Sequence, residues 1–188
     1  MIMEEMPQEV VFTKATKTKQ GLIALFTEEG FLFSVEEDTF FRFHLEQAIK
    51  NSSPLSGGEL MLLSAESARA KAKQTALRLV GVRMYAQQEL YRKLCQKYPS
   101  GDAAWAMAEL QRLGYLNDEA YARSRAGALL RKNRSKMVIL RDLAEKGIER
   151  ELALAVLEEL WQEQGEQWGN DAAIEKLLNG QYARKLQQ

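Results

Sequence analysis

The residues best suited to acid–base, nucleophilic or metal chemistry are rare in this sequence. His44 is the only histidine and Cys95 the only cysteine. His44 lies in an aromatic-rich stretch, which favours a structural role, and Cys95 lies on an apolar helical segment, where a buried and unreactive thiol is expected. The sequence contains no Walker-type glycine loop, no zinc-ligand spacing and no Gly-x-Ser-x-Gly motif. We therefore predict that the chain is not an enzyme and uses no cofactor or metal.

Charged side chains are more informative, because they are unevenly distributed. Residues 1–66 carry 5 Lys/Arg and 11 Asp/Glu, residues 67–146 carry 17 and 7, and residues 147–188 carry 4 and 8. A basic middle between acidic ends suits nucleic acid or an acidic protein face, although solvated helix faces produce the same pattern. The candidate contact residues are Arg69, Lys73, Arg83, Arg123, Arg125, Arg131, Lys132, Arg134, Lys136 and Arg141.

Aromatic residues of the same region have two interpretations. They could stack on nucleic-acid bases, but their helical spacing favours packing within and between helices. These residues are Tyr85, Tyr91, Tyr98, Trp105, Tyr115 and Tyr121.

The N-terminal part of the chain has the pattern of a small sheet. A first β-rich run is predicted to begin at Val10-Val11-Phe12, and further strands are predicted over residues 22–26 and 31–35, with tight turns at Lys19-Gln20-Gly21 and Glu28-Glu29-Gly30. Together they would form a three-stranded antiparallel meander.

The remainder is predicted to be helical. Residues 36–49 could continue the sheet, but a short helix is favoured; residues 51–55 form a linker, and Ser56 and Glu59 have the spacing of a capping box. Residues 89–97 resemble residues 138–146, an offset of 49 that indicates two three-helix units. Their helices are expected over 67–82, 86–97 and 102–113, then over 117–132, 135–146 and 149–163.

Residues 114–148 give the clearest local signals. Gly114 and Gly147 are placed to end helices, and Asn117 and Ser135 to begin them. An apolar stripe of Val138, Ile139 and Leu143 is expected to face a core.

The predicted fold class is therefore mainly α, with tandem three-helix repeats forming an elongated helical array and a small N-terminal antiparallel β meander. The predicted domains are a β-strand module (1–50), a linker with a short helix (51–66), three-helix repeat 1 (67–114), three-helix repeat 2 (115–164) and a partial third repeat (165–188).

Several motifs resemble those of the RecX family of bacterial regulators of the RecA recombinase. The family's Gly-Tyr-Leu-(Asn/Asp)-Asp motif followed by Tyr-Ala corresponds here to Gly114, Tyr115, Leu116, Asn117, Asp118, Tyr121 and Ala122. Its Lys-Gly-Ile helix ending corresponds to Lys146, Gly147 and Ile148. Weaker matches are Ala76-Leu77, Arg83, Glu89-Leu90 and Leu94 in the first unit and Phe33-Ser34-Val35 in the β extension. The sequence departs from the family at Asn133-Arg134-Ser135, where a Gly or Gly-Lys pair is usual, and residues 165–188 lack its Arg-Gly-Phe motif.

The resemblance implies a negative regulator that lies in the groove of the RecA–DNA filament. Such a protein would inhibit filament extension, strand exchange, ATP hydrolysis and coprotease activity. The partner would be the RecA nucleoprotein filament, with single- or double-stranded DNA as a further candidate. The alternatives are a stand-alone helical DNA-binding protein and a scaffold for another protein.

The chain's location and assembly follow from its composition. No apolar run approaches the roughly 20 residues that span a bilayer, and Met1–Val10 has no signal-peptide pattern. The lone cysteine fits the cytosol. We therefore predict a cytoplasmic monomer without membrane contact.

Overall fold

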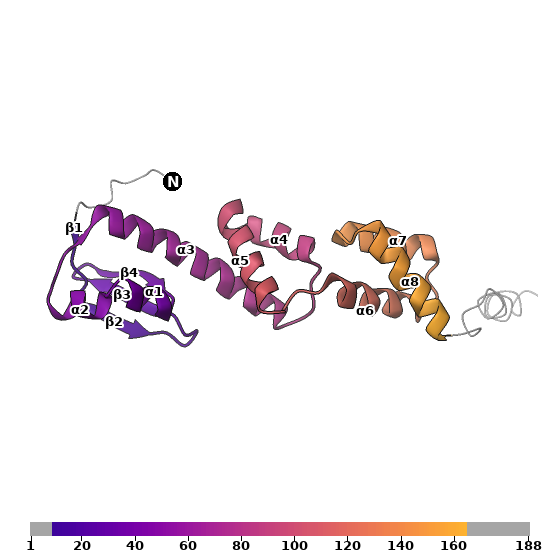
Figure 1. The fold of residues 1–188 in the computed structure, drawn as a ribbon, viewed down its shortest axis with the longest axis horizontal. Coiled ribbons are helices and arrows are strands. Elements are labelled where there is room, and N and C mark those ends of the chain that lie inside the picture. The colour runs from indigo at the N-terminus through magenta and orange to yellow at the C-terminus, as the bar shows by residue number, and fades with distance from the viewer. Residues whose placement is uncertain (1–8, 165–188) are drawn as a thin grey trace, which may run out of the picture. The chain divides into compact units, whose positions relative to one another are not determined.

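A computed structural model describes residues 9–164 of the chain, and Figure 1 shows its elements. The strands are β1 (Glu9–Val10), β2 (Lys14–Lys17), β3 (Ile23–Thr27), β4 (Gly30–Val35) and β5 (Leu55–Ser56). The helices are α1 (Glu37–Arg42), α2 (Leu45–Lys50), α3 (Gly57–Val80), α4 (Gln87–Cys95), α5 (Ser100–Arg112), α6 (Asp118–Leu130), α7 (Lys136–Lys146) and α8 (Arg150–Gln164). The mainly α class with a small N-terminal antiparallel sheet is thus confirmed. No helix in this described part is long and apolar enough to cross a membrane.

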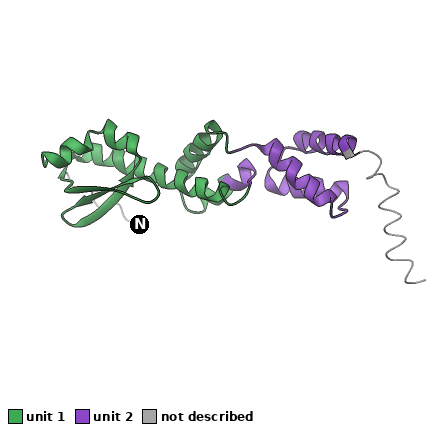
Figure 2. Ribbon diagram, turned by 90° about the horizontal axis from the view of Figure 1, so that it is seen from below, with its two compact units in different colours: residues 1–83, 91–115 green, residues 84–90, 116–188 purple. Residues whose placement is uncertain are grey.

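The chain divides into two compact units, which Figure 2 shows in different colours. Unit 1 contains the residues up to 83 together with residues 91–115. Unit 2 contains residues 84–90 together with the residues from 116 onwards. The start of α4 therefore belongs to unit 2 and its remainder to unit 1. The predicted third repeat, residues 165–188, lies outside the described residues, and the elongated arrangement of the repeats stays a prediction.

A three-stranded antiparallel meander in the order β2-β3-β4 forms the main sheet of unit 1. The predicted turn at 19–21 is confirmed, with Gly21 at φ +81°, and the turn at 28–30 is confirmed, with Gly30 at φ +119°. The β-rich run predicted to begin at Val10-Val11-Phe12 contains two strands, and the second of them, β2, is the first strand of the meander. β1 instead pairs with β5, and Phe12 follows β1 in an irregular stretch with a side chain only 1% exposed. Its apolar character reflects core burial and not pairing within the meander.

The long helix α3 completes the core of the sheet. Leu60 and Leu63, near its start, are buried together with Leu25 and Val35 of the meander. The predicted capping box is confirmed, because the Ser56 Oγ accepts a hydrogen bond from Glu59 N, and the Glu59 carboxylate accepts one from Ser56 N at 2.8 Å.

The predicted break between a short helix within 51–66 and a helix over 67–82 does not occur. α3 runs without interruption from Gly57 to Val80. The physical reason is that residues 64–72 contain no Gly or Pro and many alanines, which favour a continuous helix.

The stretch 36–49, predicted as one short helix, forms the two helices α1 and α2. They meet at His44, whose backbone has φ +50° in the left-handed region. This turn places both Phe40 and Leu45 in the core of the sheet. Tertiary packing therefore overrides helix propensity at this position.

Unit 1 also contains α5, which packs along the later part of α3. Ala72 and Ala76 of α3 are fully buried, as are Ala103 and Ala106 of α5. Small side chains on both helices let their backbones approach closely. Gly114 follows α5 at φ +76°, which confirms the predicted helix end.

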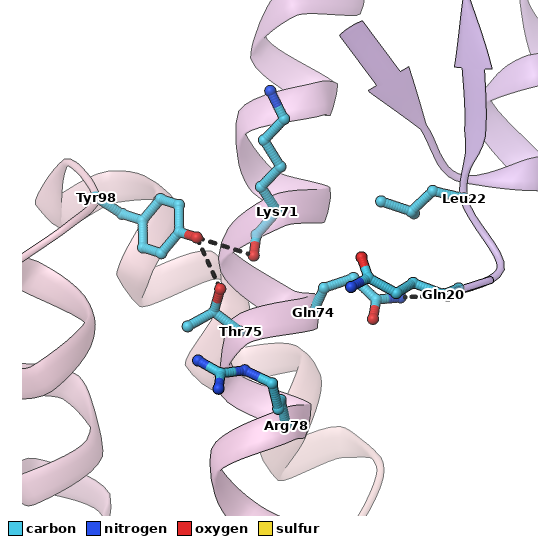
Figure 3. A pocket seen from close by; sticks show the side chains of 7 residues that line it. All are labelled: Gln20, Leu22, Lys71, Gln74, Thr75, Arg78 and Tyr98. Carbon is cyan, nitrogen blue, oxygen red and sulfur yellow. Dashed lines mark hydrogen bonds between the residues drawn. The ribbon is translucent and has the colours of Figure 1, made fainter. Parts of the chain in front are cut away.

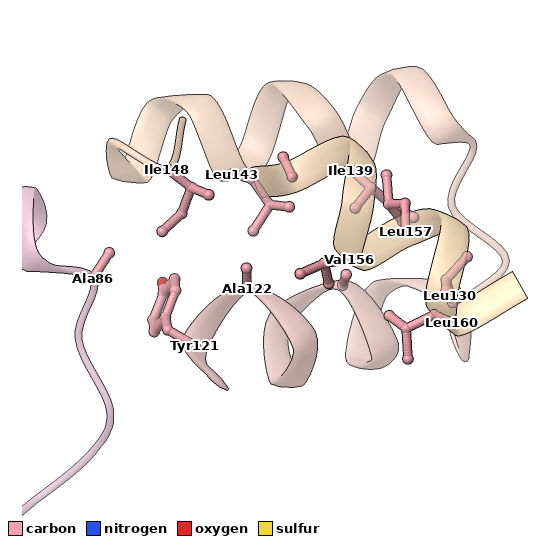
Figure 4. Close-up of a cluster of buried hydrophobic side chains, with 12 residues drawn as sticks. Ala86, Tyr121, Ala122, Leu130, Ile139, Leu143, Ile148, Val156, Leu157 and Leu160 are labelled. Atoms are coloured by element: carbon pink, nitrogen blue, oxygen red, sulfur yellow. The ribbon is translucent and has the colours of Figure 1, made fainter. Parts of the chain in front are cut away.

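Unit 2 is a three-helix domain of α6, α7 and α8 around one apolar core, shown in Figure 4. Asn117 caps α6 by accepting a hydrogen bond from Ala120 N at 2.9 Å, as predicted. Ser135 occupies the N-cap position of α7 as predicted, although its side chain makes no capping hydrogen bond. Ile139 and Leu143 are fully buried as predicted, whereas Val138 is 47% exposed. Ile139 and Leu143 are four residues apart and so lie on the same face of α7, which faces the core of unit 2.

Candidate interaction site

Two of the predicted contact residues, Arg69 and Lys73 of α3, are already paired within unit 1. Arg69 lies 3.7 Å from the Glu66 carboxylate. The Lys73 ammonium lies 2.9 Å from Glu36 and 3.9 Å from Glu109, with its side chain 16% exposed. A partner would have to displace these internal carboxylates, so both residues are better suited to stabilising unit 1 than to contacting another molecule.

Two arginines of α6 hold unit 2 together. Arg123 donates to Glu163 and to Glu159, with distances of 2.9 and 2.6 Å. Arg125 donates two hydrogen bonds to Asp142 of α7, at 2.7 and 2.8 Å. The hydrogen bonds from Arg125 lower the pKa of the Asp142 carboxyl, and the same bonds raise the pKa of the Arg125 guanidinium. These side chains are fixed by complementary charge.

The remaining candidates differ in their surroundings. Arg141 pairs with Glu145 one turn along α7 at 3.2 Å, and both side chains are well exposed. The Lys136 ammonium lies 5.2 Å from the ring centre of Trp161, within cation–π range. Arg83 lies exposed in the segment between α3 and α4.

Three residues between α6 and α7 stand apart from the others. Arg131, Lys132 and Arg134 are all exposed, and none forms an ion pair with any residue in the range 9–164. The turn is held by backbone bonds, including Asn133 N to Leu130 O at 2.7 Å, with Asn133 at φ +54°. We call residues 131–136 the basic turn. Of the predicted contact residues, these three have the charges most available to a partner.

Two exposed apolar residues follow the basic turn. Met137 is 77% exposed and Val138 is 47% exposed at the start of α7. Cations beside exposed apolar side chains can bind a surface that offers both acidic and apolar groups. Sequence reasoning assigned Val138 to the core and so missed this feature.

The motif residues of unit 2 have structural roles around residues 84–90. The Asp118 carboxylate accepts a hydrogen bond from Gln87 N at 2.8 Å. The Lys146 ammonium lies 2.9 Å from the Glu89 carboxylate. Burial raises the pKa of Asp118, an effect that the Gln87 hydrogen bond opposes. These residues attach the start of α4 to the three-helix domain.

Apolar and backbone contacts reinforce this attachment. Tyr121 and Ile148 are buried in the same core as Ala86, as Figure 4 shows. Gly147 has φ +89°, and a Cβ added there would lie 2.5 Å from the Cβ of Gln88. The Lys-Gly-Ile ending therefore makes a close approach to α4 possible. Sequence reasoning identified these motif positions but gave no indication that residues 84–90 are their partner.

The other motif residues differ in exposure. Tyr115 is 57% exposed, while Leu116 is buried at 8%. Of the remaining aromatic residues, Tyr85 and Tyr121 are buried, as expected for packing residues. Tyr98 is fixed by its hydroxyl, which lies 2.7 Å from the Thr75 Oγ1.

The two residues with the most reactive side chains are separate from one another and on the surface. Cys95 is exposed at the end of α4, so the prediction of a buried thiol is wrong. The apolar positions of α4 are Leu90 and Leu94, and the next position, Cys95, points away from their face. His44 is exposed in the turn between α1 and α2. Among residues 9–164 no cluster of three or more His, Cys, Asp or Glu side chains could hold a metal ion.

An N-terminal sheet followed by two three-helix groups defines a tandem three-helix protein. The family model described as "RecX, first three-helix domain" matches residues 72–110, and the one described as "RecX, second three-helix domain" matches residues 117–157. The chain belongs to the RecX family.

Relatives and a solved structure agree with this assignment. The protein named Regulatory protein RecX of Lactobacillus delbrueckii subsp. bulgaricus is 32% identical over 183 residues, which cover 93% of this chain and 63% of that protein. The protein of the same name from Caldanaerobacter subterraneus subsp. tengcongensis is 25% identical over 146 residues, covering 77% of this chain and 72% of the relative. The chain thus spans less than two thirds of the length of the Lactobacillus relative. A crystal structure of regulatory protein RecX has the same fold, with a TM-score of 0.68, 18% identity, and coverage of 95% of this chain and 85% of that one.

Proposed function

We propose that this protein is a non-enzymatic negative regulator of the RecA recombinase. It acts in the cytoplasm as a monomer, binds in the groove of the RecA–DNA filament and inhibits filament extension, strand exchange, ATP hydrolysis and coprotease activity. Membership of the RecX family supports this proposal, since the relatives that share both three-helix domains are named regulatory proteins.

The observation that carries the proposal is the basic turn. Arg131, Lys132 and Arg134 lie within four consecutive residues, are exposed, and have no carboxylate partner within the described part of the chain. A filament groove contains phosphates and protein surface together. Cations neutralise phosphates and release counterions, and the exposed Met137 beside them offers an apolar contact to protein.

The experiment is the single-strand-DNA-dependent ATPase of RecA, measured with this protein added at a substoichiometric ratio. The test variant is Arg131→Glu, Lys132→Glu, Arg134→Glu. The matched control, Lys19→Glu, Lys50→Glu, Arg150→Glu, makes the same change in net charge at exposed positions elsewhere.

We expect the wild type and the control to inhibit alike. The test variant should need at least about tenfold more protein, because three favourable charge contacts become repulsive. Each lost phosphate contact should also lower the slope of log affinity against log salt concentration by about 1. Equal inhibition by all three proteins would contradict the role of the basic turn.

Measuring the affinity of the protein alone for bare DNA distinguishes the proposed filament regulator from the main alternative, a stand-alone DNA-binding protein. A stand-alone DNA-binding protein binds bare DNA tightly, with a steep salt dependence, and leaves the RecA ATPase unchanged. The filament regulator instead inhibits the ATPase at concentrations at which it binds bare DNA weakly.

A further inference from the structure

A groove in unit 1 has the properties of a peptide-binding site and lies outside the basic turn. It has a volume of about 650 Å³, within the range of about 300–1,000 Å³ typical of ligand sites. Its apolar wall comes from Leu32 and Phe33 of β4 and from Leu60 of α3. Leu32 is 43% exposed, so an apolar side chain from a partner would cover it.

The rim of the groove is basic. Lys71 of α3 and Lys97 of the loop after α4 are exposed and form no ion pair within residues 9–164. Among residues 9–164, no Asp or Glu lines the groove. The local charge therefore favours an acidic ligand.

A second cavity of about 340 Å³ lies beside α3, and Figure 3 shows the residues that line it. Lys71 and Tyr98 belong to the walls of both. The Tyr98 hydroxyl donates to the Lys71 backbone carbonyl at 3.2 Å and lies 2.7 Å from the Thr75 Oγ1, which fixes the shared wall. Arg78 adds a third cation, and no carboxylate from the described part of the chain lines this cavity. An extended ligand could thus meet positive charge along its length.

A buried hydroxyl in the groove lacks a partner. Ser67 is 2% exposed and lies in the wall formed by α3, and its Oγ has no hydrogen-bond partner among residues 9–164. A buried hydroxyl without a hydrogen bond is unfavourable, whereas the backbone of a bound peptide offers both donors and acceptors. This observation is independent of the charge of the rim.

We propose that the groove binds a short acidic segment of a partner protein. An apolar side chain of the segment packs against Leu32, its carboxylates pair with Lys71 and Lys97, and its backbone hydrogen-bonds to the Ser67 hydroxyl. The proposal does not depend on RecA being the partner.

The test uses the full chain and a fluorescein-labelled hexapeptide of two leucines flanked on each side by two glutamates. Fluorescence anisotropy should show saturable binding with a Kd below about 1 mM. The amide resonances that shift in ¹⁵N–¹H spectra should include Leu32, Ser67, Lys71 and Lys97. A matched peptide with lysines in place of the glutamates should not bind.

Two variants separate binding from folding. Lys71→Glu with Lys97→Glu should weaken binding at least about tenfold, while the control Lys19→Glu with Lys50→Glu should leave it unchanged. Ser67→Ala should weaken binding about threefold to tenfold and yet leave the urea midpoint equal or higher, because it removes a hydroxyl that is unsatisfied in the free protein. A merely structural serine would lower the midpoint instead.

Four results would overturn the proposal. The first is no binding of the acidic peptide at about 1 mM, and the second is equal binding of the lysine peptide. The third is displacement of the acidic peptide by an oligothymidylate that binds more tightly and depends on the same lysines. The fourth is peptide binding that is seen only after residues 1–8 are deleted. The third would make the groove a nucleic-acid surface, and the fourth would make the chain's own N-terminus its occupant.

Discussion

Replacing Gly147 with alanine tests how the motif residues attach α4 to unit 2. The backbone at Gly147 has φ +89°, a left-handed conformation that costs an L residue about 1–2 kcal/mol. The new Cβ would also lie 2.5 Å from the Gln88 Cβ, too close for two carbon atoms, and such overpacking costs about 1–3 kcal/mol. Alanine also lowers the conformational entropy of the unfolded chain, which offsets part of this cost. We therefore expect the free energy of unfolding to fall by about 2–4 kcal/mol.

Two other glycines separate these contributions. Gly114 has φ +76° and open space around its Cβ position, so Gly114→Ala should show only the backbone cost of about 1 kcal/mol. Gly127 lies inside α6, where an added Cβ meets only the Arg131 side chain at 3.6 Å. Gly127→Ala should therefore stabilise unit 2 by about 0.5–1 kcal/mol.

Urea unfolding followed by far-UV circular dichroism gives the free energy of unfolding of each variant. Amide hydrogen exchange then localises the effect, which for Gly147→Ala should be faster exchange at residues 86–90 and 143–148. Adding Gln88→Gly removes the Cβ that collides, and should recover part of the loss. A Gly147→Ala variant no less stable than Gly114→Ala would refute the close approach of Gly147 to α4.

Three further predictions concern single side chains. Cys95 should react with a thiol reagent in the folded protein at the rate of an exposed cysteine; protection until unfolding would contradict its exposure. Asp142→Asn should lower stability by about 1 kcal/mol at neutral pH. Because the pKa of Asp142 is lowered in the folded state by hydrogen bonds from Arg125, the wild type loses this advantage as the pH falls through that pKa, so urea midpoints of the two proteins should converge in acid. Finally, Lys146→Glu should lower the urea midpoint of unfolding, because the Lys146 ammonium lies 2.9 Å from the Glu89 carboxylate. Adding Glu89→Lys reverses both charges and should restore the midpoint. Absence of this rescue would rule out a structural ion pair.

Helix ends were the features best predicted from the sequence, because their causes are local. The capping box at Ser56 and Glu59 and the cap at Asn117 depend on residues three positions apart. Gly114 and Gly147 end helices through their own backbone conformation. A reader of the sequence needs only a few neighbouring residues to find such signals.

Features that depend on distant contacts were predicted less well. β1 pairs with β5 about 45 residues later, which no local pattern indicates. The left-handed turn at His44 is explained by the burial of Phe40 and Leu45 in one core, and not by a turn-forming residue. Cys95 follows Leu94 on α4, and only the packed structure shows that Leu94 is the buried one of the two.

The predicted basic contact residues illustrate the same limit for the candidate site. Charge density counts every Lys and Arg equally, but a cation already held by a carboxylate must lose that partner before it can bind a phosphate. Arg125 would have to give up two hydrogen bonds to Asp142. Because Arg125 and Asp142 are 17 residues apart in sequence, no local sequence pattern indicates this pair. Arg131, Lys132 and Arg134 have no such loss to make within the described chain. Their contribution to binding should therefore exceed that of the paired arginines, even though all of them are equally charged.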